Sequence, residues 1–321
     1  MAATFKEDAR RELLSVLPKS ECCIKAFLSA VCKVSGTIEG TGRRQVLCAA
    51  LDSEECAEAV AALFRTLYPA EFTVTEHRMK IAGADRRVYK VTVPHGFTAS
   101  ALEDLEIMSV NGGGLWDFVR GIPQQILRKQ CCMQAYFKGL YLACGSVYAP
   151  SPSDVEDKKG GYHFELKLAD EEFASSVMEL LSDLRINTKM SDRGGSKLLY
   201  VKDKDDIVRI LCTLELSDSA SKMQCIIDER ETANLLNRTI ICETANMDKT
   251  FAASSRLMIA IARLKDRGEY DKLPKALKDT ADARALYSEA SMQELAEKLN
   301  VSKSCLAHRL QKLEKLADSL T

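Results

Sequence analysis

The sequence lacks the cysteine and histidine spacings that common metal-binding motifs require. It contains twelve cysteines but no C-x-x-C pair, and its four histidines do not pair with cysteines at the spacing of zinc ligands. These spacings indicate neither a metal site nor a disulfide framework. We therefore expect no metal and no other cofactor, and we expect the cysteines to be small buried side chains in a reducing cytoplasm.

Long apolar runs and a strong net charge are also absent. No stretch reaches the roughly eighteen apolar residues of a membrane-spanning helix, and the first residues, MAATFKEDARRELL, have a charged amphipathic pattern unlike that of a signal peptide. We expect a cytoplasmic protein with no membrane or small-molecule partner. Because the net charge is only −1, any nucleic-acid site has to be a local basic patch.

An internal repeat is the strongest feature that is present. Residues 22–38 (CCIKAFLSAVCKVSGTI) align without a gap with residues 131–147 (CCMQAYFKGLYLACGSV). The matched pairs include Cys22 with Cys131, Cys23 with Cys132, Ala30 with Gly139 and Gly36 with Gly145. Each segment predicts a helix that ends at its glycine. Ala135, Gly139 and Ala143 recur every fourth position and so lie on one stripe, which lets the two helices pack closely.

A second matched block extends the repeat beyond these helices. Residues 51–63 match residues 168–180, and the order of predicted strands and helices is the same in both halves. The sequence thus predicts an α+β domain over residues 1–220, with repeats at about 20–110 and 125–215 that are related by a pseudo-twofold axis. Each repeat is expected to be a small antiparallel sheet backed by helices.

From about residue 217 the sequence predicts only helices. Residues 228–238 and 250–264 have helical periodicity, and the polar segment 242–249 separates them. We therefore expect residues 221–321 to form an all-α domain that follows the duplicated one.

A helix-turn-helix motif is predicted at about residues 290–316. Ser291 and Glu294 have the spacing of a capping box at the start of a first helix. Asn300 stands where a tight turn needs a left-handed backbone, and Ser302 can cap a second helix. This combination favours a DNA-binding motif over the alternative, a plain helical hairpin with a solvated charged face.

The outward side of the second helix is the predicted DNA-binding surface. Between Val301 and Lys315 four lysines and arginines stand against one acidic residue, which gives a local net charge of +3. The candidate DNA-binding residues are Ser302, Lys303, Ser304, Ala307, His308, Arg309 and Lys312. The two lysines of this set are expected to contact mainly phosphates. Ser304, His308 and Arg309 are expected to reach base edges.

The chain as a whole resembles the WhiA proteins of Gram-positive bacteria. The resemblance rests on motifs spread along the sequence, namely Gly121-Ile122-Pro123, Cys131-Cys132, Ala135-Tyr136, Gly139, Gly145-Ser146-Val147, Asn237-Arg238, Cys242-Glu243-Thr244-Ala245-Asn246, Lys249, Val301-Ser302-Lys303-Ser304 and His308-Arg309-Leu310. It implies a pseudo-twofold duplicated LAGLIDADG homing-endonuclease-like domain. An all-α domain follows, whose helix-turn-helix is similar to region four of sigma factors.

The resemblance also implies a function. Members of the family are transcriptional regulators linked to cell division and chromosome segregation, and to sporulation in filamentous members. The implied partner is double-stranded DNA at the nucleoid, with a WhiB-type iron–sulfur regulator in some lineages.

This chain has Cys305 and Ala307 where Gly and Asn are usual in the family. Because alanine cannot make the bidentate contact of asparagine to adenine, we expect a different DNA sequence to be read.

LAGLIDADG nucleases place a metal-binding acid at the end of each repeat helix, directly before the glycine. In this chain these positions are Ser35 and Cys144, and neither side chain is a hard anionic oxygen ligand for magnesium. We therefore expect no catalytic residue and no enzymatic activity.

Basic residues of the first repeat offer a candidate secondary face for DNA or a partner: Arg43, Arg44, Arg78, Lys80, Arg86, Arg87 and Lys90. An ordinary solvated sheet face is the alternative.

Three functional hypotheses are open at this point. The first is a sequence-specific DNA-binding transcriptional regulator. The second is an interaction or scaffold protein that recruits a partner to DNA or to the division machinery. The third is a residual metal-dependent DNA endonuclease, which the two missing acids disfavour.

Overall fold

The computed structural model describes residues 4–41, 44–81, 84–110, 116–150 and 161–320. The chain divides into two compact units, Met1–Arg230 and Glu231–Thr321, each of which has its own cluster of buried apolar residues. Among the described residues, no helix is both long enough and apolar enough to cross a membrane.

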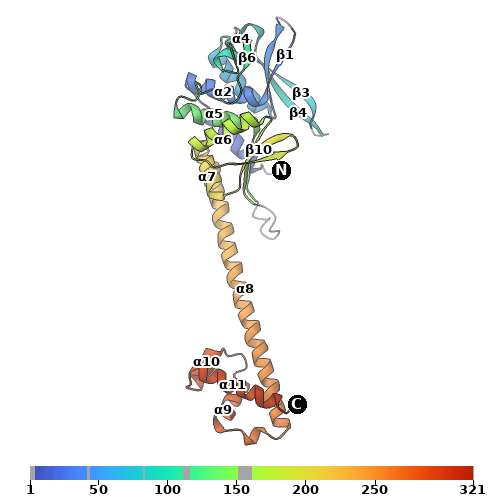
Figure 1. Ribbon diagram of the computed structural model, residues 1–321, viewed down its shortest axis with the longest axis vertical. Coiled ribbons are helices and arrows are strands. Elements are labelled where there is room, and N and C mark those ends of the chain that lie inside the picture. The colour runs from blue at the N-terminus through green and yellow to red at the C-terminus, as the bar shows by residue number, and fades with distance from the viewer. Residues whose placement is uncertain (1–3, 42–43, 82–83, 111–115, 151–160, 321) are drawn as a thin grey trace. The chain divides into compact units, whose positions relative to one another are not determined.

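The first unit is a duplicated arrangement of helices and strands (Figure 1). Its first half contains α1 (Phe5–Ser15), α2 (Glu21–Ser35), β1 (Gly36–Glu39), β2 (Val46–Leu51), α3 (Glu54–Leu67), β3 (Thr73–Ile81), β4 (Ala84–Thr92) and α4 (His95–Asp104). A short hairpin follows, formed by β5 (Met108–Val110) and β6 (Trp116–Phe118). The second half contains α5 (Gln130–Cys144), β7 (Gly145–Tyr148), β8 (His163–Leu168), α6 (Glu171–Asp183), β9 (Lys189–Arg193), β10 (Ser196–Val201) and α7 (Lys204–Thr213).

The two halves have the same sheet topology. The strand orders are β1-β2-β4-β3 and β7-β8-β10-β9, and the neighbouring strands are antiparallel in both sheets. In each half a 15-residue helix, α2 or α5, runs directly into the edge strand at a glycine, Gly36 or Gly145. The predicted α+β duplication is confirmed.

Helices α2 and α5 lie side by side at the centre of the first unit (Figure 1). The predicted small residues are buried between them, including Ala26 and Ala30 in α2 and Ala135 and Gly139 in α5. Because these positions carry little or no side chain, the two backbones approach closely. The helix pair therefore joins the two halves into one core.

The second unit is entirely helical. Its elements are the later part of α8 (Ser217–Asp266), a 3-10 turn η3 (Tyr270–Lys272), α9 (Lys275–Leu286), α10 (Met292–Lys298) and α11 (Lys303–Asp318). The first turns of α8 belong to the first unit, because Ala220, Met223 and Ile227 are part of its core. Leu257 and Ile261, near the other end of α8, are part of the core of the second unit.

Helix α8 corrects one prediction from the sequence. The polar segment 242–249 was expected to separate two helices, but it is helical throughout. The segment contains no glycine or proline that would break a helix. Just after it, the Thr250 hydroxyl donates a hydrogen bond to the Asn246 carbonyl at 2.9 Å, so this polar side chain bonds back onto the helix.

Candidate nucleic-acid interface

The first helix of the predicted motif, α10, begins with a complete capping box. The Ser291 hydroxyl accepts a hydrogen bond from the Glu294 amide at 3.3 Å, and the Glu294 carboxylate accepts one from the Ser291 amide at 2.8 Å. Leu295 and Ala296 follow and are buried. The capping box thus fixes where the helix starts, and the next turn anchors it in the core of the second unit.

The turn between the two helices has the geometry that the sequence predicts. Asn300 has a positive φ of 54°. Its amide bonds to the Glu297 carbonyl at 3.0 Å, and the Val301 amide bonds to the Ala296 carbonyl at 3.0 Å. These two bonds form a Schellman motif, in which a left-handed residue ends a helix and redirects the chain.

The second helix, α11, starts at an N-cap serine and is held by three leucines. The Ser302 hydroxyl accepts a hydrogen bond from the Cys305 amide at 3.2 Å. Leu306, Leu310 and Leu313 lie on one side of the helix and are at most 5% exposed. Burial of this side orients the opposite side of α11 toward solvent.

The predicted DNA-binding residues gather on the first three turns of α11. Six of the seven are exposed: Ser302, Lys303, Ser304, Ala307, His308 and Lys312. Arg309 is half-buried, because it lies at the flank between the leucine side and the exposed side. The structure therefore brings the predicted set together on one short helical surface, with Arg309 at its border.

Two residues that the predicted set omits also lie on this surface. Gln311 and Lys315 are exposed and, together with Ser304 and His308, follow a spacing of four, three and four residues. This spacing places the four side chains on one stripe, opposite the buried leucines. Helical periodicity applied to the whole length of α11 is the signal that identifies them.

The cations of this surface are not engaged within the protein. In the described residues 231–320, salt bridges join Lys272 to Glu269 and Lys278 to Asp271. No hydrogen bond or salt bridge to a described residue involves Lys303, Arg309 or Lys312. Three positive charges are thus free to meet an anionic partner such as the DNA backbone.

The basic residues of the first repeat do not share one face of their sheet. Arg78 pairs with Arg87 across β3 and β4, and Arg87 lies on the same side of β4 as Val91, which is part of the core. Because side chains alternate along a strand, Arg86 and Lys90 point to the opposite face. The candidate secondary surface is therefore divided between two sides.

Two further observations reduce this surface. The Lys90 ammonium pairs with the Glu39 carboxylate at 2.6 Å, so its charge is already balanced across the sheet. The second observation is that Arg43 and the side chain of Lys80 lie outside the described residues, so the structure does not place them. Arg44, in contrast, is exposed and remains a candidate. A role of this face in binding DNA or a partner stays a prediction.

Ser35 and Cys144 occupy the last residues of α2 and α5, as the alignment of the repeats predicts. The Ser35 hydroxyl donates to the Val31 carbonyl at 2.8 Å, and the Cys144 thiol donates to the Leu140 carbonyl at 3.3 Å. Burial raises the pKa of the Cys144 thiol to about 12. A hydroxyl and a neutral thiol that bond back onto their own helices do not fit magnesium, which prefers anionic oxygen ligands.

The cysteines depart from what the sequence predicts. Four of them are exposed rather than buried: Cys131, Cys212, Cys225 and Cys242. In addition, two adjacent pairs that are far apart in the sequence, Cys22-Cys23 and Cys131-Cys132, come together in space. No spacing motif in the sequence joins these four, but the repeat places them at equivalent ends of two packed helices, where they form a group that could hold a metal ion. The expectation that the protein binds no metal stays a prediction.

Family models for WhiA proteins match three consecutive segments of the chain. The WhiA N-terminal LAGLIDADG-like domain matches residues 21–108, the WhiA LAGLIDADG-like domain matches residues 133–233, and the WhiA C-terminal HTH domain matches residues 236–317. The predicted duplicated domain and the predicted helix-turn-helix thus correspond to successive domains of one family.

Relatives match over nearly the whole chain. The probable cell division protein WhiA of Bacillus subtilis (strain 168) is 30% identical and covers 99% of this chain and 97% of its own length. The protein of the same name from Syntrophomonas wolfei subsp. wolfei is 31% identical, with 97% and 96% covered. The crystal structure of full-length DUF199/WhiA from Thermatoga maritima is 22% identical, covers 99% of both chains and has a TM-score of 0.57, which shows the same fold. The chain belongs to the WhiA family.

Proposed function

We propose that this protein is a sequence-specific DNA-binding transcriptional regulator that acts in cell division. The observation that carries the proposal is the exposed surface of α11, with free lysines and polar side chains on the second helix of a helix-turn-helix. Relatives that match nearly the whole chain are named probable cell division proteins, which supports the process. A role in chromosome segregation, and in sporulation in some relatives, rests on the family resemblance.

The geometry of α11 suggests how the surface divides its contacts with DNA. In helix-turn-helix proteins the N-terminal part of the second helix reaches base edges in the major groove. Ser304 and His308 lie at the centre of the exposed stripe there, so we assign them to base contacts. Lys303 and Lys312 lie beside the stripe and are assigned to phosphates, which hold the helix in register.

We infer that the first unit is not catalytic. Ser35 and Cys144 stand where LAGLIDADG nucleases carry acids, and both are bonded to main-chain carbonyls of their own helices. The remaining role of this unit would be to contact DNA or a protein. A WhiB-type iron–sulfur regulator as that protein rests on the family resemblance alone, and an association with the nucleoid follows if the protein binds DNA.

Capture of fragmented genomic DNA tests the proposal. The full-length protein is incubated with the fragments in magnesium, and bound DNA is sequenced. The same experiment uses Lys303→Ala/Arg309→Ala, and Lys275→Ala as a control that removes an exposed charge from α9 instead. We expect intact fragments enriched at a few sites with the wild type and with the control, and loss of enrichment with the double variant.

The alternatives give different results in this experiment. Magnesium-dependent cuts at the enriched sites would support a residual endonuclease and contradict the non-catalytic assignment. Wild-type enrichment no higher than that of the double variant would contradict DNA recognition by α11. That result would favour the interaction hypothesis, in which the first unit recruits a partner.

A further inference from the structure

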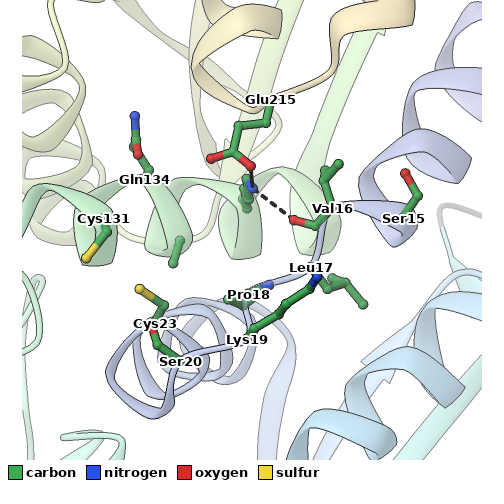
Figure 2. Close-up of a pocket in the computed structure, with 12 residues that line it drawn as sticks. Ser15, Val16, Leu17, Pro18, Lys19, Ser20, Cys23, Cys131, Gln134 and Glu215 are labelled. Atoms are coloured by element: carbon green, nitrogen blue, oxygen red, sulfur yellow. Dashed lines mark hydrogen bonds and ion pairs between the residues drawn. The ribbon is translucent and has the colours of Figure 1, made fainter.

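Four cysteines form a compact cluster between the two central helices. Cys22 and Cys23 lie in the first turn of α2, and Cys131 and Cys132 lie in the first turn of α5. Their four Sγ atoms all lie within 4.8 Å of one another. Figure 2 shows Cys23 and Cys131 from the two helices with their sulfur atoms in the space between them.

The duplication explains why the cluster forms. The pairs occupy equivalent positions of the two repeats, the second and third residues of a 15-residue helix. Since α2 and α5 pack closely through small residues, equivalent ends of the helices meet. The close packing therefore converts two adjacent pairs, each without a metal-binding spacing of its own, into one group of four thiols.

We propose that these four cysteines bind a single zinc ion as a tetrathiolate site. Zinc takes four thiolates in a tetrahedron with Zn–S distances of about 2.3 Å, which places the sulfur atoms about 3.8 Å apart. The observed upper limit of 4.8 Å is close to this separation. An iron–sulfur cluster has to fit several iron atoms between its thiolates and so requires a wider arrangement.

The surroundings of the cluster favour thiolates that bind a cation. Both helices present their N-terminal ends to it, where main-chain N–H groups and the helix dipole stabilise negative charge. Neither N-cap residue, Ser20 or Lys129, uses its side chain to cap the first turn. Instead, the pKa of the Cys22 thiol is lowered, mainly by a hydrogen bond with Ser20 and to a lesser extent by one with Cys132.

Burial acts in the other direction on two members of the cluster. It raises the pKa of Cys23 and raises that of Cys132 to about 12. Binding of zinc would release the protons of the thiols to solvent and replace them with Zn–S bonds, so affinity should rise with pH.

An ion can reach the cluster from solvent. A cleft of about 360 Å³ opens beside it, and Ser20, Cys23, Cys131 and Gln134 line its wall (Figure 2). The acid of this cleft, Glu215, is already paired with the Lys138 ammonium at 2.7 Å. The thiols are thus the groups beside this cleft that are suited to a soft divalent cation.

The position of the site indicates a structural role. Ser35 lies twelve residues beyond Cys23 on the same helix, about 18 Å along its axis at 1.5 Å per residue. The zinc site is therefore distinct from the position of the nuclease metal. With all four ligands supplied by the protein, the ion has no open position for chemistry. It would join the N-terminal ends of α2 and α5 and so hold the two repeats together.

Metal analysis of the full-length protein, purified under reducing and anaerobic conditions, tests this proposal. The metal content is measured first. The metal is then removed with a chelator, and the protein is titrated with cobalt(II), whose spectrum reports ligand type and geometry. The variant Cys23→Ser/Cys132→Ser removes two ligands. Cys212→Ser/Cys225→Ser is the matched control, because it replaces two exposed cysteines outside the cluster.

We expect about one zinc per chain. Cobalt should give thiolate-to-metal charge-transfer bands and the strong visible bands of tetrahedral coordination. The cluster variant should lose the metal and the bands, and the control should keep both. A wild-type protein that takes up neither zinc nor cobalt would overturn the proposal, as would iron with labile sulfide, or disulfides among these four cysteines.

A second measurement does not depend on folding of the variants. Alkylation of the wild type followed by mass spectrometry reports each cysteine separately. Zinc should protect Cys131, which is exposed, and Cys22, which is partly exposed, and chelation should remove this protection while Cys212 reacts equally in both states. Cys23 and Cys132 are buried and should react slowly with or without zinc. Equal reactivity of Cys22 and Cys131 with and without zinc would contradict the site.

Discussion

Gly139 of α5 lies directly against the main chain of Phe27 in α2. A Cβ atom placed on Gly139 would come within 2.3 Å of the Phe27 carbonyl oxygen and 2.9 Å of the Ala30 Cβ. The first contact is with main chain, which cannot move aside as a flexible side chain would. The close packing of α2 against α5, which joins the two repeats, therefore depends on the absence of a side chain at this position.

The substitution Gly139→Ala should destabilise the first unit. Overpacking of this kind costs about 1–3 kcal/mol. Replacement of glycine by alanine inside a helix stabilises it by only roughly 1 kcal/mol, so we expect the overpacking to dominate. Thermal unfolding monitored by circular dichroism should show a lower midpoint. Gly96→Ala in α4 is the control, because a Cβ there meets nothing within 4 Å. If Gly139→Ala unfolded at the wild-type temperature, the inference that α2 and α5 pack too closely for a side chain here would be wrong.

The substitution Lys303→Ala should change the salt dependence of DNA binding. Each phosphate contact contributes about 0.9 to the slope of log K against log salt concentration, because bound counterions are released. Loss of the Lys303 contact should reduce the slope by roughly this amount. Affinities are measured by fluorescence anisotropy at several salt concentrations, with Lys275→Ala as the control. An unchanged slope for Lys303→Ala would mean that α11 docks differently from our proposal.

Cys32 should make the stability of the first unit fall at high pH. Its side chain is buried in α2, and burial raises the pKa of the thiol from 9.0 to about 12. The unfolded state therefore loses its proton first, so the stabilisation is complete below pH 9 and is lost as pH rises from 9 to 12. At pH 10 the loss should be about 1.4 kcal/mol relative to pH 7.

Comparison with Cys32→Ala isolates this effect from other titrating groups. The wild type and the variant are unfolded with urea under reducing conditions at pH 7, 9 and 10. The difference in unfolding free energy between them should be constant up to about pH 8 and shrink above pH 9. A difference that stayed the same at pH 10 would show that the thiol is not held in its neutral form.

The helix-turn-helix could be predicted in detail because its signals are local. Asn300 forms the left-handed turn, Ser302 caps α11, and Leu306 faces the core, all as the spacing in the sequence indicates. The duplication was predictable for a related reason. A gapless alignment and a stripe of small residues report on helix pairing even across a long stretch of chain.

Two spatial relations were not read from the sequence, because neither is contained in a local pattern. Cys22 and Cys131 are 109 residues apart (131 − 22), so no spacing motif joins them. The repeat had aligned these two residues, and the predicted close packing of the helices would have brought them together if the two signals had been combined. Similarly, Arg86 and Arg87 are neighbours in the sequence, but the alternation of side chains in β4 sends them to opposite faces.

The central claim is that α11 reads DNA sequence, and a comparison of His308→Ala with Lys312→Ala tests it most directly. The measured quantity is the ratio of affinities for a captured genomic site and for a scrambled duplex of equal length. We predict that His308→Ala lowers this ratio about fivefold or more, as expected for a lost base contact worth at least ~1 kcal/mol. Lys312→Ala should weaken both affinities and leave the ratio unchanged. An unchanged ratio in His308→Ala, together with the same result for Ser304→Ala, would contradict the account.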